Sequence, residues 1–300
     1  MTTVAESAPI KTALRPRRGP FADFMIRLFR EKPLGAAGAV ICVLFLFCGL
    51  FADVLAPYGF NQISPINRLK PPSLNFPFGT DNLGRDMLSR CLYGAQLSVI
   101  IGFCAAGLAT VISIVLGVLT GYLGGKFDMI VQRFVDAWMS FPELIVLIVV
   151  VSVVGPGMPQ IIVVLGLALG IAGSRIVRGA VISVRENMYV HAAKSTGAKT
   201  MRILWRHVLP NVMAPVIVLF TNRVAVAILA ESGLSFLGFG VPPPAPTWGG
   251  MLSGSGRAYM YQGPWLALAP GLCLTIVVYA ISVFGDALRD LLDPRMRGSR

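Results

Sequence analysis

Charged residues are scarce in this sequence. Only 13% of its 300 residues are Asp, Glu, Lys or Arg, whereas 55% are hydrophobic, and the mean hydropathy is +0.72. A typical soluble domain is about 25% charged. The composition therefore excludes an ordinary soluble protein and indicates a membrane protein.

Residues that usually carry catalysis or bind metals are also few. The two histidines, His191 and His207, have no Ser or Cys partner at a recognisable spacing. The five cysteines include no CxxC pair, so they lack the spacing of a zinc or redox site. No GxxxxGK[ST] sequence occurs, which excludes a phosphate-binding loop of that type. We therefore expect no catalytic site, no metal site and no cofactor bound by this chain.

Basic residues outnumber acidic ones, and they are unevenly placed. Of 26 Lys and Arg, 20 lie before the first apolar run, after the last one or in alternate loops, five lie in the other loops, and Arg223 lies within an apolar run. The positive-inside rule predicts that both termini are cytoplasmic. Because the basic residues flank apolar runs instead of forming one groove with interleaved aromatic residues, we expect no nucleic-acid partner.

Apolar runs of membrane-spanning length predict an all-α fold with six transmembrane helices. An amphipathic helix at Phe21–Arg30 is expected to lie along the inner leaflet before the first run. Five of the predicted spans cover residues 34–56, 97–123, 158–176, 212–237 and 265–284. The remaining span, third in the chain, follows a cytoplasmic turn predicted at 124–143 and continues to residue 154. An even number of spans agrees with two cytoplasmic termini.

Glycines recur four residues apart in two of these spans, as Gly117 with Gly121 and as Gly166 with Gly170. Such pairs either let two helices approach closely or are simply tolerated in membrane helices. The sequence leaves both interpretations open.

Polar residues interrupt the fifth span at Asn222, Arg223 and Glu231. An arginine near the bilayer centre costs about 2.5 to 3.5 kcal/mol on insertion scales, which the aliphatic residues of this span offset. Arg223 is therefore expected to face the bundle interior, a partner subunit or a wet path. All three residues are candidates for a translocation path; the alternative for Arg223 is a structural pair with another span.

The internal segment Ser183–Asn211 is too polar to cross a bilayer and too short to form a domain. We predict a helix at Glu186–Ser195 that breaks at Gly197, where glycine supplies a left-handed or side-chain-free position. A basic second helix is predicted to end at Leu209–Pro210. Such a segment is expected to project from the membrane as a small knuckle with a nearly bare tip.

This knuckle resembles the EAA loop of ABC-importer permeases. Ala192, Ala193, Gly197 and Leu209–Pro210 stand at the spacing of that loop, and His191 stands where the family has glutamate. The resemblance implies that these residues form a coupling helix that docks into an ATPase. The alternative is an ordinary amphipathic loop between two spans.

Two strings on the predicted outer side are similar to signatures of the C-type permeases of dipeptide, oligopeptide and nickel importers. Residues 79–98 match GTDxxGRDxxSRxxYGxxxS, and residues 237–252 match LGxGxxPPxPxWGxML. Residues 285–294, GDALRDLLDP, are similar to the ending GDxLRDxLDP of the same family.

Without the family resemblance, the residues of the two outer strings have purely structural interpretations. The first would be a short surface helix in which Asp86 pairs with Arg90. The second would be a loop whose prolines exclude helix and whose aromatic residues form an interfacial belt. The resemblance instead implies surfaces that face a substrate-binding protein, with Asp81, Arg85, Asp86 and Trp248 as the candidates.

The family resemblance implies a complete assembly. It suggests a type I ABC importer permease fold, with a cytoplasmic tail at residues 1–33, a first helix and periplasmic segment at 34–96, and a core permease at 97–300 that holds the EAA-type loop at 186–210. The implied partners are a second permease in a heterodimer, two ATPase subunits or domains that bind ATP and Mg, an extracytoplasmic binding protein and the bacterial inner membrane. The implied cargo is a di- or oligopeptide, with nickel or another small solute as alternatives.

The alternative function from a different class is a secondary transporter or channel that works without ATPase partners. It would need ion-coupling carboxylates at mid-membrane. Only Glu231 is available, and it lies near the outer end of its span.

Overall fold

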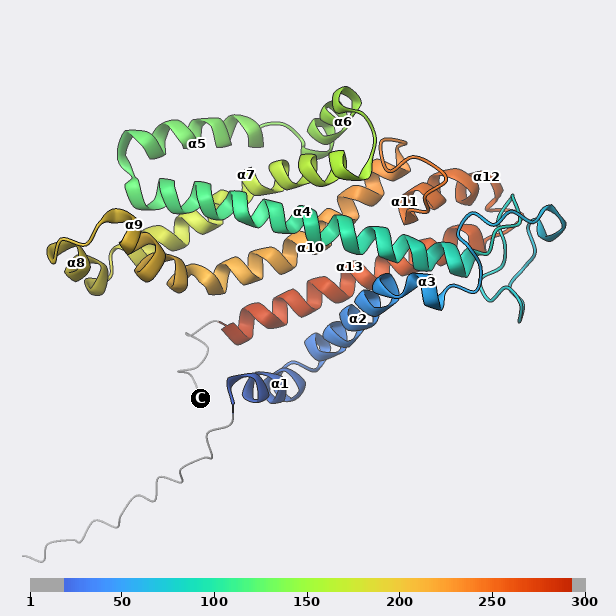
Figure 1. Cartoon of the computed structure of the whole chain (residues 1–300), viewed down its shortest axis with the longest axis horizontal. Helices are drawn as coiled ribbons and strands as arrows, with labels where there is room; N and C mark the ends of the chain where they lie inside the picture. The colour runs from blue at the N-terminus through green and yellow to red at the C-terminus, as the bar shows by residue number, and fades with distance from the viewer. Residues whose placement is uncertain (1–18, 293–300) are drawn as a thin grey trace, which may run out of the picture.

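Long apolar helices lie side by side in an elongated bundle (Figure 1). The computed structural model describes residues 19–292. Most of the tail expected at 1–33, and the last two residues of the GDALRDLLDP string, lie outside the described residues. The short helices of the knuckle, α8 and α9, lie at one end of the bundle, and α11, α12 and the 56–86 segment lie at the other end.

Most predicted spans appear as helices close to the expected bounds. Within residues 19–292, five helices are long and apolar enough to cross a membrane, and a bent pair brings the number to six. Three helices extend well beyond their predicted spans: α4 begins at Met87, α7 continues to Arg185 and α13 continues to Leu292. The membrane helices are α2 (Pro33–Leu50), followed by the short α3 (Ala52–Leu55), α4 (Met87–Leu123), α7 (Met158–Arg185), α10 (Met213–Phe236) and α13 (Trp265–Leu292).

The predicted cytoplasmic turn at 124–143 is wrong. Its residues form α5 (Gly125–Met139), which is followed by α6 (Glu143–Val154) after a bend of 88°. Hydropathy missed α5 because Lys126, Asp128, Arg133 and Asp136 interrupt its apolar residues. The acidic residues of α5 are paired with arginines of α7, so a helix that appears too polar in sequence has its acidic charges compensated in the fold.

Glycine residues form the contact between α4 and α7. A methyl group built on Gly117 would lie 2.6 Å from Cβ of Val177 and 2.7 Å from the carbonyl oxygen of Ser174. Gly121, Gly166 and the other glycines of this seam meet α4 or α7 atoms in the same way. Of the two interpretations that the sequence left open, close helix packing is confirmed.

The amphipathic segment near the N-terminus forms the predicted helix, α1 (Pro20–Glu31). Its Leu28 is buried against Ala36 of α2 and Leu291 of α13. Lys32, between α1 and α2, forms an ion pair with Asp290 of α13. The first helix is therefore fixed to the same end of the bundle as the last turn of α13.

The outer segment between α10 and α13 is more helical than its prolines suggested. It contains α11 (Trp248–Met251), the π turn η4 (Leu252–Gly256) and α12 (Arg257–Tyr259). Proline disfavours helix mainly in the turn that precedes it, and residues 248–259 contain no proline. The expectation of a wholly extended loop is therefore corrected.

Candidate functional site

The knuckle begins with α8 (Met188–Ser195), which ends as predicted at Gly197. Gly197 has φ +78°, its N–H donates to the carbonyl of Lys194, and the N–H of Ala198 donates to the carbonyl of Ala193. These two bonds make a Schellman motif, in which a left-handed residue lets the chain reverse and satisfies the last carbonyls of the helix.

The tip of the knuckle is open. His191, Ala192 and Gly197 are exposed, and a methyl group built on Gly197 would meet nothing within 4 Å. Ala193 is half-buried. The structure thus presents the predicted candidates at the end of the bundle, on a surface with little side-chain bulk.

Exposed apolar side chains flank this tip and were missed in the sequence. Met188, Met201 and Trp205 have 88%, 63% and 66% of their surface exposed. Large exposed apolar groups at a loop commonly mark a protein interface. Apolar and basic residues alternate along 188–205, which was the sequence signal for an amphipathic surface. The helix geometry was needed to show which of the apolar residues face outward.

Buried residues fix the knuckle to the bundle. Val190 of α8 packs in one cluster with Val181 of α7, Val118 of α4 and Leu219 of α10. Ile203, Leu204 and Val208 fill the same cluster from the second half of the knuckle. A displacement of α8 must therefore move the helices that it packs against, because protein interiors are close-packed and resist compression.

The second helix of the knuckle does not end at Leu209–Pro210 as predicted. Helical structure passes from α9 (Thr200–Ile203) through the π turn η2 (Leu204–Val208) and the 3₁₀ turn η3 (Leu209–Val212) into α10. Proline lacks the N–H that would continue regular α-helical bonding. The chain adapts by locally changing the hydrogen-bond spacing, and Nδ2 of Asn211 donates to the carbonyl of His207 at 2.6 Å.

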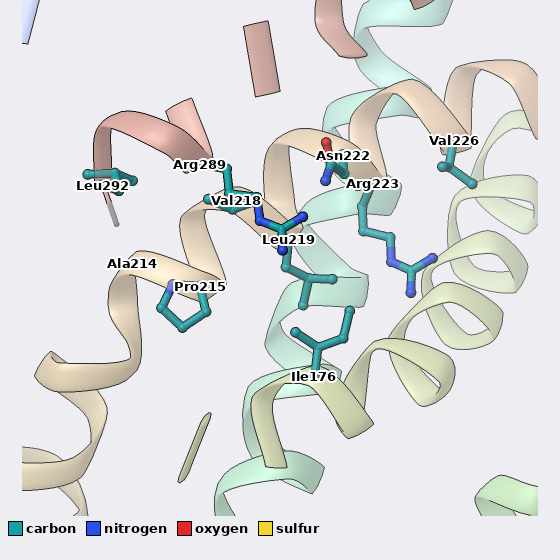
Figure 2. A pocket seen from close by; sticks show the side chains of 10 residues that line it. All are labelled: Ile176, Ala214, Pro215, Val218, Leu219, Asn222, Arg223, Val226, Arg289 and Leu292. Carbon is teal, nitrogen blue, oxygen red and sulfur yellow. The ribbon is translucent and has the colours of Figure 1, made fainter. Parts of the chain in front are cut away.

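A cavity of about 650 Å³ opens on the first half of α10, and ten residues line it. Asn222 and Arg223 both line this cavity, together with Ile176 of α7 and Arg289 of α13 (Figure 2). The remaining wall is mainly apolar. Two of the three translocation candidates therefore meet in one cavity.

Glu231 does not reach this cavity. Its side chain is 1% exposed, and one carboxylate oxygen accepts a hydrogen bond of 2.6 Å from Ser235 Oγ one helical turn away. Ser232 Oγ lies 3.4 Å from the other oxygen. The structure thus separates Glu231 from Asn222 and Arg223 and places it in the packed outer half of α10.

The first outer string is not an exposed surface helix, and its ion pairs centre on Asp81. Asp81 is fully buried and accepts hydrogen bonds from the backbone N–H groups of Leu83 and Arg85, at 2.8 and 2.9 Å. Its other oxygen accepts from Nε of Arg85 at 2.7 Å and lies 3.8 Å from Nε of Arg90. The acidic partner of Arg90 is therefore Asp81, and the predicted Asp86–Arg90 pair is wrong.

Asp86 caps α4. Its carboxylate accepts hydrogen bonds from the N–H and the Oγ of Ser89, at 2.8 and 2.6 Å. An aspartate at this position satisfies an N–H group that has no partner within the helix. Asp86 is 3% exposed, so it stabilises the start of α4 and does not offer a free charge to a partner.

Trp248 is 2% exposed and belongs neither to an interfacial belt nor to an outward surface. Its indole Nε1 donates to the carbonyl of Cys91 at 3.1 Å. A methyl group built on Gly94 would lie 2.8 Å from the Trp248 ring. The two family strings therefore pack against each other, and the glycine of the first leaves room for the tryptophan of the second.

The end of the bundle opposite the knuckle also has a cavity, of about 520 Å³, which residues of both strings line. Arg85 and Arg90 line it from the first string, Pro242 and Thr247 are among the residues that line it from the second, and Tyr259 lines it from α12. Of the four residues expected to face a binding protein, Asp81, Asp86 and Trp248 are buried within the chain, and only Arg85 reaches this cavity.

Ion pairs join α5 to α7. Arg178 donates from Nε and Nη2 to the two carboxylate oxygens of Asp128, at 2.7 and 2.6 Å, and Arg175 is paired with Asp136. A two-pronged arginine–carboxylate contact fixes orientation as well as distance. These residues were not among the sequence candidates because the partners are distant in sequence: Asp128 and Arg178 lie 50 positions apart.

Comparisons with known proteins agree with this architecture. Residues 113–298 match the family described as "Binding-protein-dependent transport system inner membrane component", and residues 19–72 match the "N-terminal TM domain of oligopeptide transport permease C". The chain is 37% identical to the dipeptide transport system permease protein DppC of Alkalihalophilus pseudofirmus, over 95% of this chain and 92% of that protein. It is 41% identical to a putative peptide transport system permease protein of Brucella suis, over 90% of each.

A solved structure has a similar fold. The MetNI methionine ABC transporter in an inward-facing conformation matches with a TM-score of 0.58 and 20% identity, over 69% of this chain and 98% of that chain. The fold is therefore that of a type I ABC importer permease. The role is that of a multi-pass transport subunit and not of an enzyme. The chain belongs to the binding-protein-dependent transport system inner membrane components, as an ABC importer permease of the DppC and OppC type.

Proposed function

We propose that this chain forms, with a second related permease, the translocation path of an ATP-driven importer of di- or oligopeptides. The observation that carries the cargo class is the similarity to a dipeptide permease along nearly the whole of both chains. The importer would lie in the bacterial inner membrane with both chain termini in the cytoplasm. The uneven placement of basic residues supports this orientation.

The knuckle is the proposed docking site for the ATPase partners, which would bind ATP and Mg. Its small-residue tip at His191, Ala192, Ala193 and Gly197 would enter a groove on the ATPase, and the exposed Met188 and Trp205 would add apolar contact. Leu209–Pro210 would keep the tip at a fixed distance from α10. Closure of the ATPase pair would move α8 and, through the buried cluster around Val190, the ends of α7 and α10.

The outer face is the proposed contact for a substrate-binding protein. The cavity between the two family strings is held open by a packed framework that includes the buried Asp81 and Trp248. In this proposal Asp81 and Trp248 stabilise the contact surface from within the chain. Of the four residues expected to face the binding protein, Arg85 is the one that lines the cavity.

Purification in mild detergent from native membranes, followed by mass spectrometry, tests the assembly. We expect a second multi-pass permease and ATPases with phosphate-binding loops to co-purify with this chain. Recovery of the chain alone, or only with copies of itself, would favour the secondary transporter instead.

Ala193→Asp tests the docking role separately. A carboxylate on the tip would need to be desolvated in an apolar groove, so we expect uptake to be abolished while the amount of protein in the membrane is unchanged. Lys194→Gln, a change at the neighbouring exposed position, is the control. Normal uptake by Ala193→Asp at a normal protein level would refute the docking assignment.

A further inference from the structure

The cavity on α10 holds polar side chains that lie close to glycines of the neighbouring helices. A methyl group built on Gly285 of α13 would lie 2.7 Å from Oδ1 of Asn222, so this glycine leaves room for the amide. One built on Gly173 of α7 would be in ordinary contact with Nη2 of Arg223, at 3.5 Å, which shows that the guanidinium group lies against α7. Figure 2 shows Arg223 pointing toward α7, and Arg289 reaching toward α10.

Neither arginine of this cavity is paired with an acid in the part of the chain that the structure describes. Arg223 makes no ion pair there, and its Nε is buried without a hydrogen-bond partner. Glu143 acts on Arg223 electrostatically, yet the two form no ion pair at contact distance. Among residues 19–292, no carboxylate lines the cavity. An unpaired guanidinium group in the membrane is costly unless it meets an anion or water.

The shape and lining of the cavity fit a small anionic ligand with variable apolar parts. Its volume of about 650 Å³ lies within the range of about 300 to 1,000 Å³ of ligand sites. Planar guanidinium groups bind carboxylates through two parallel hydrogen bonds. The amide of Asn222 adds a further donor, whereas Ile176, Val218 and Leu219 offer contacts that do not discriminate among apolar side chains.

We propose that this cavity is a transit site for the cargo, in which Arg223 binds the carboxylate at the C-terminal end of a peptide. Asn222 is its neighbouring polar contact, and Arg289 attracts the carboxylate at the edge nearer the end of α13. This assignment rests on the proposed function as a peptide permease. It explains why an arginine lies within a span without an ion-pair partner among the described residues.

Uptake by the assembled importer, reconstituted in liposomes with its ATPases and binding protein, tests the assignment. The probes are labelled alanine peptides of two to five residues and the same peptides with C-terminal amides. For the free-acid peptides, we expect Arg223→Gln to lower the uptake rate at least tenfold and Arg223→Lys to lower it less. ATP hydrolysis stimulated by loaded binding protein should stay within twofold of the unchanged chain, because the coupling segment is intact.

Peptides with a C-terminal amide distinguish a loss of carboxylate binding from a general defect in transport, because they have no C-terminal carboxylate. Any uptake of amidated peptides should be affected much less by Arg223→Gln than uptake of the free acids. Arg30→Gln, which removes an exposed arginine of α1, is the matched control and should leave both rates unchanged. Equal losses for acids and amides, or free-acid uptake by Arg223→Gln at the normal rate, would overturn the assignment.

Three further outcomes are distinguishable. If the unchanged importer carries none of the peptides, the proposed function fails before the role of Arg223 is addressed. If Arg223→Gln does not assemble, Arg223→Lys and Arg289→Gln decide, and normal free-acid uptake by both would refute the site. A third outcome is that Arg223→Gln no longer binds an anionic phospholipid that the unchanged importer retains, while the uptake rates of free-acid and amidated peptides fall equally. That outcome would identify a lipid site and overturn the cargo assignment.

Discussion

The glycine seam between α4 and α7 makes a quantitative prediction about Gly117→Ala. The added methyl group would lie 2.6 Å from Cβ of Val177, 2.7 Å from the carbonyl oxygen of Ser174 and 2.9 Å from the backbone N of Arg178. Carbon atoms in favourable contact are about 3.5 to 4.0 Å apart, so the two helices must separate by roughly 1 Å. Two of the three obstructing atoms belong to backbone, and no rotation of a side chain can remove them.

Gly107→Ala on the same helix is the matched control, because a methyl group there meets nothing within 4 Å. Both changes gain about 1 kcal/mol of helix propensity, so this contribution cancels in the comparison. The difference that remains is the overpacking energy, about 1 to 3 kcal/mol.

Thermal unfolding of the two purified variant importers in detergent measures this difference. A difference of about 2 kcal/mol corresponds to roughly 5 °C in the midpoint for a chain of this size. We therefore expect the Gly117→Ala importer to unfold several degrees below the Gly107→Ala importer. Equal midpoints would show that α4 and α7 are not held at the distance seen in the structure.

Three other predictions concern coupling and the α5–α7 contact. Gly197→Arg should abolish uptake without reducing membrane insertion, because it places a large side chain at a left-handed position on the open tip; normal uptake at a normal protein level would contradict docking through this tip. His191→Glu should preserve or increase the ATP hydrolysis that loaded binding protein stimulates, since the family has glutamate there; complete loss of stimulation would show that the family role does not transfer. Asp128→Arg should lower the stability of the importer by about 1 to 3 kcal/mol, between the costs for exposed and for buried ion pairs, because the Asp128–Arg178 pair is partly buried. Adding Arg178→Asp should restore much of the loss in thermal unfolding; a double variant no more stable than the single one would rule out a direct pair.

The sequence was sufficient to predict those features of the fold that depend only on residues close to one another along the chain. The bounds of α10 follow from an apolar run long enough to outweigh its few polar residues, and the end of α8 follows from Gly197, whose left-handed conformation is a property of its own backbone. The resemblance to a permease family likewise rested on short strings. These features needed no knowledge of which distant segments meet.

Features that depend on distant partners could not be read in this way. Helix α5 looked like a polar turn because Arg178, the partner of Asp128, lies 50 positions away. Trp248 looked like an interfacial residue because the carbonyl that accepts its N–H belongs to Cys91, 157 positions earlier. Asp81 and Asp86 looked exposed because charge suggests solvent, whereas both are buried: Asp81 accepts hydrogen bonds from two backbone N–H groups, and Asp86 accepts from Ser89 through one of its two oxygens.

The packing of α10 links the knuckle to the proposed cargo cavity. Leu219 belongs to the buried cluster that holds Val190 and Ile203 of the knuckle, and it also lines the cavity beside Arg223. Helical structure runs without interruption from Thr200 to Phe236, so the second half of the knuckle and this wall are parts of one element. Because close-packed helices shift between discrete arrangements instead of compressing, a tilt of the knuckle must change the cavity. A cargo that contacts Arg223 differently in the two arrangements would in turn bias the equilibrium between them.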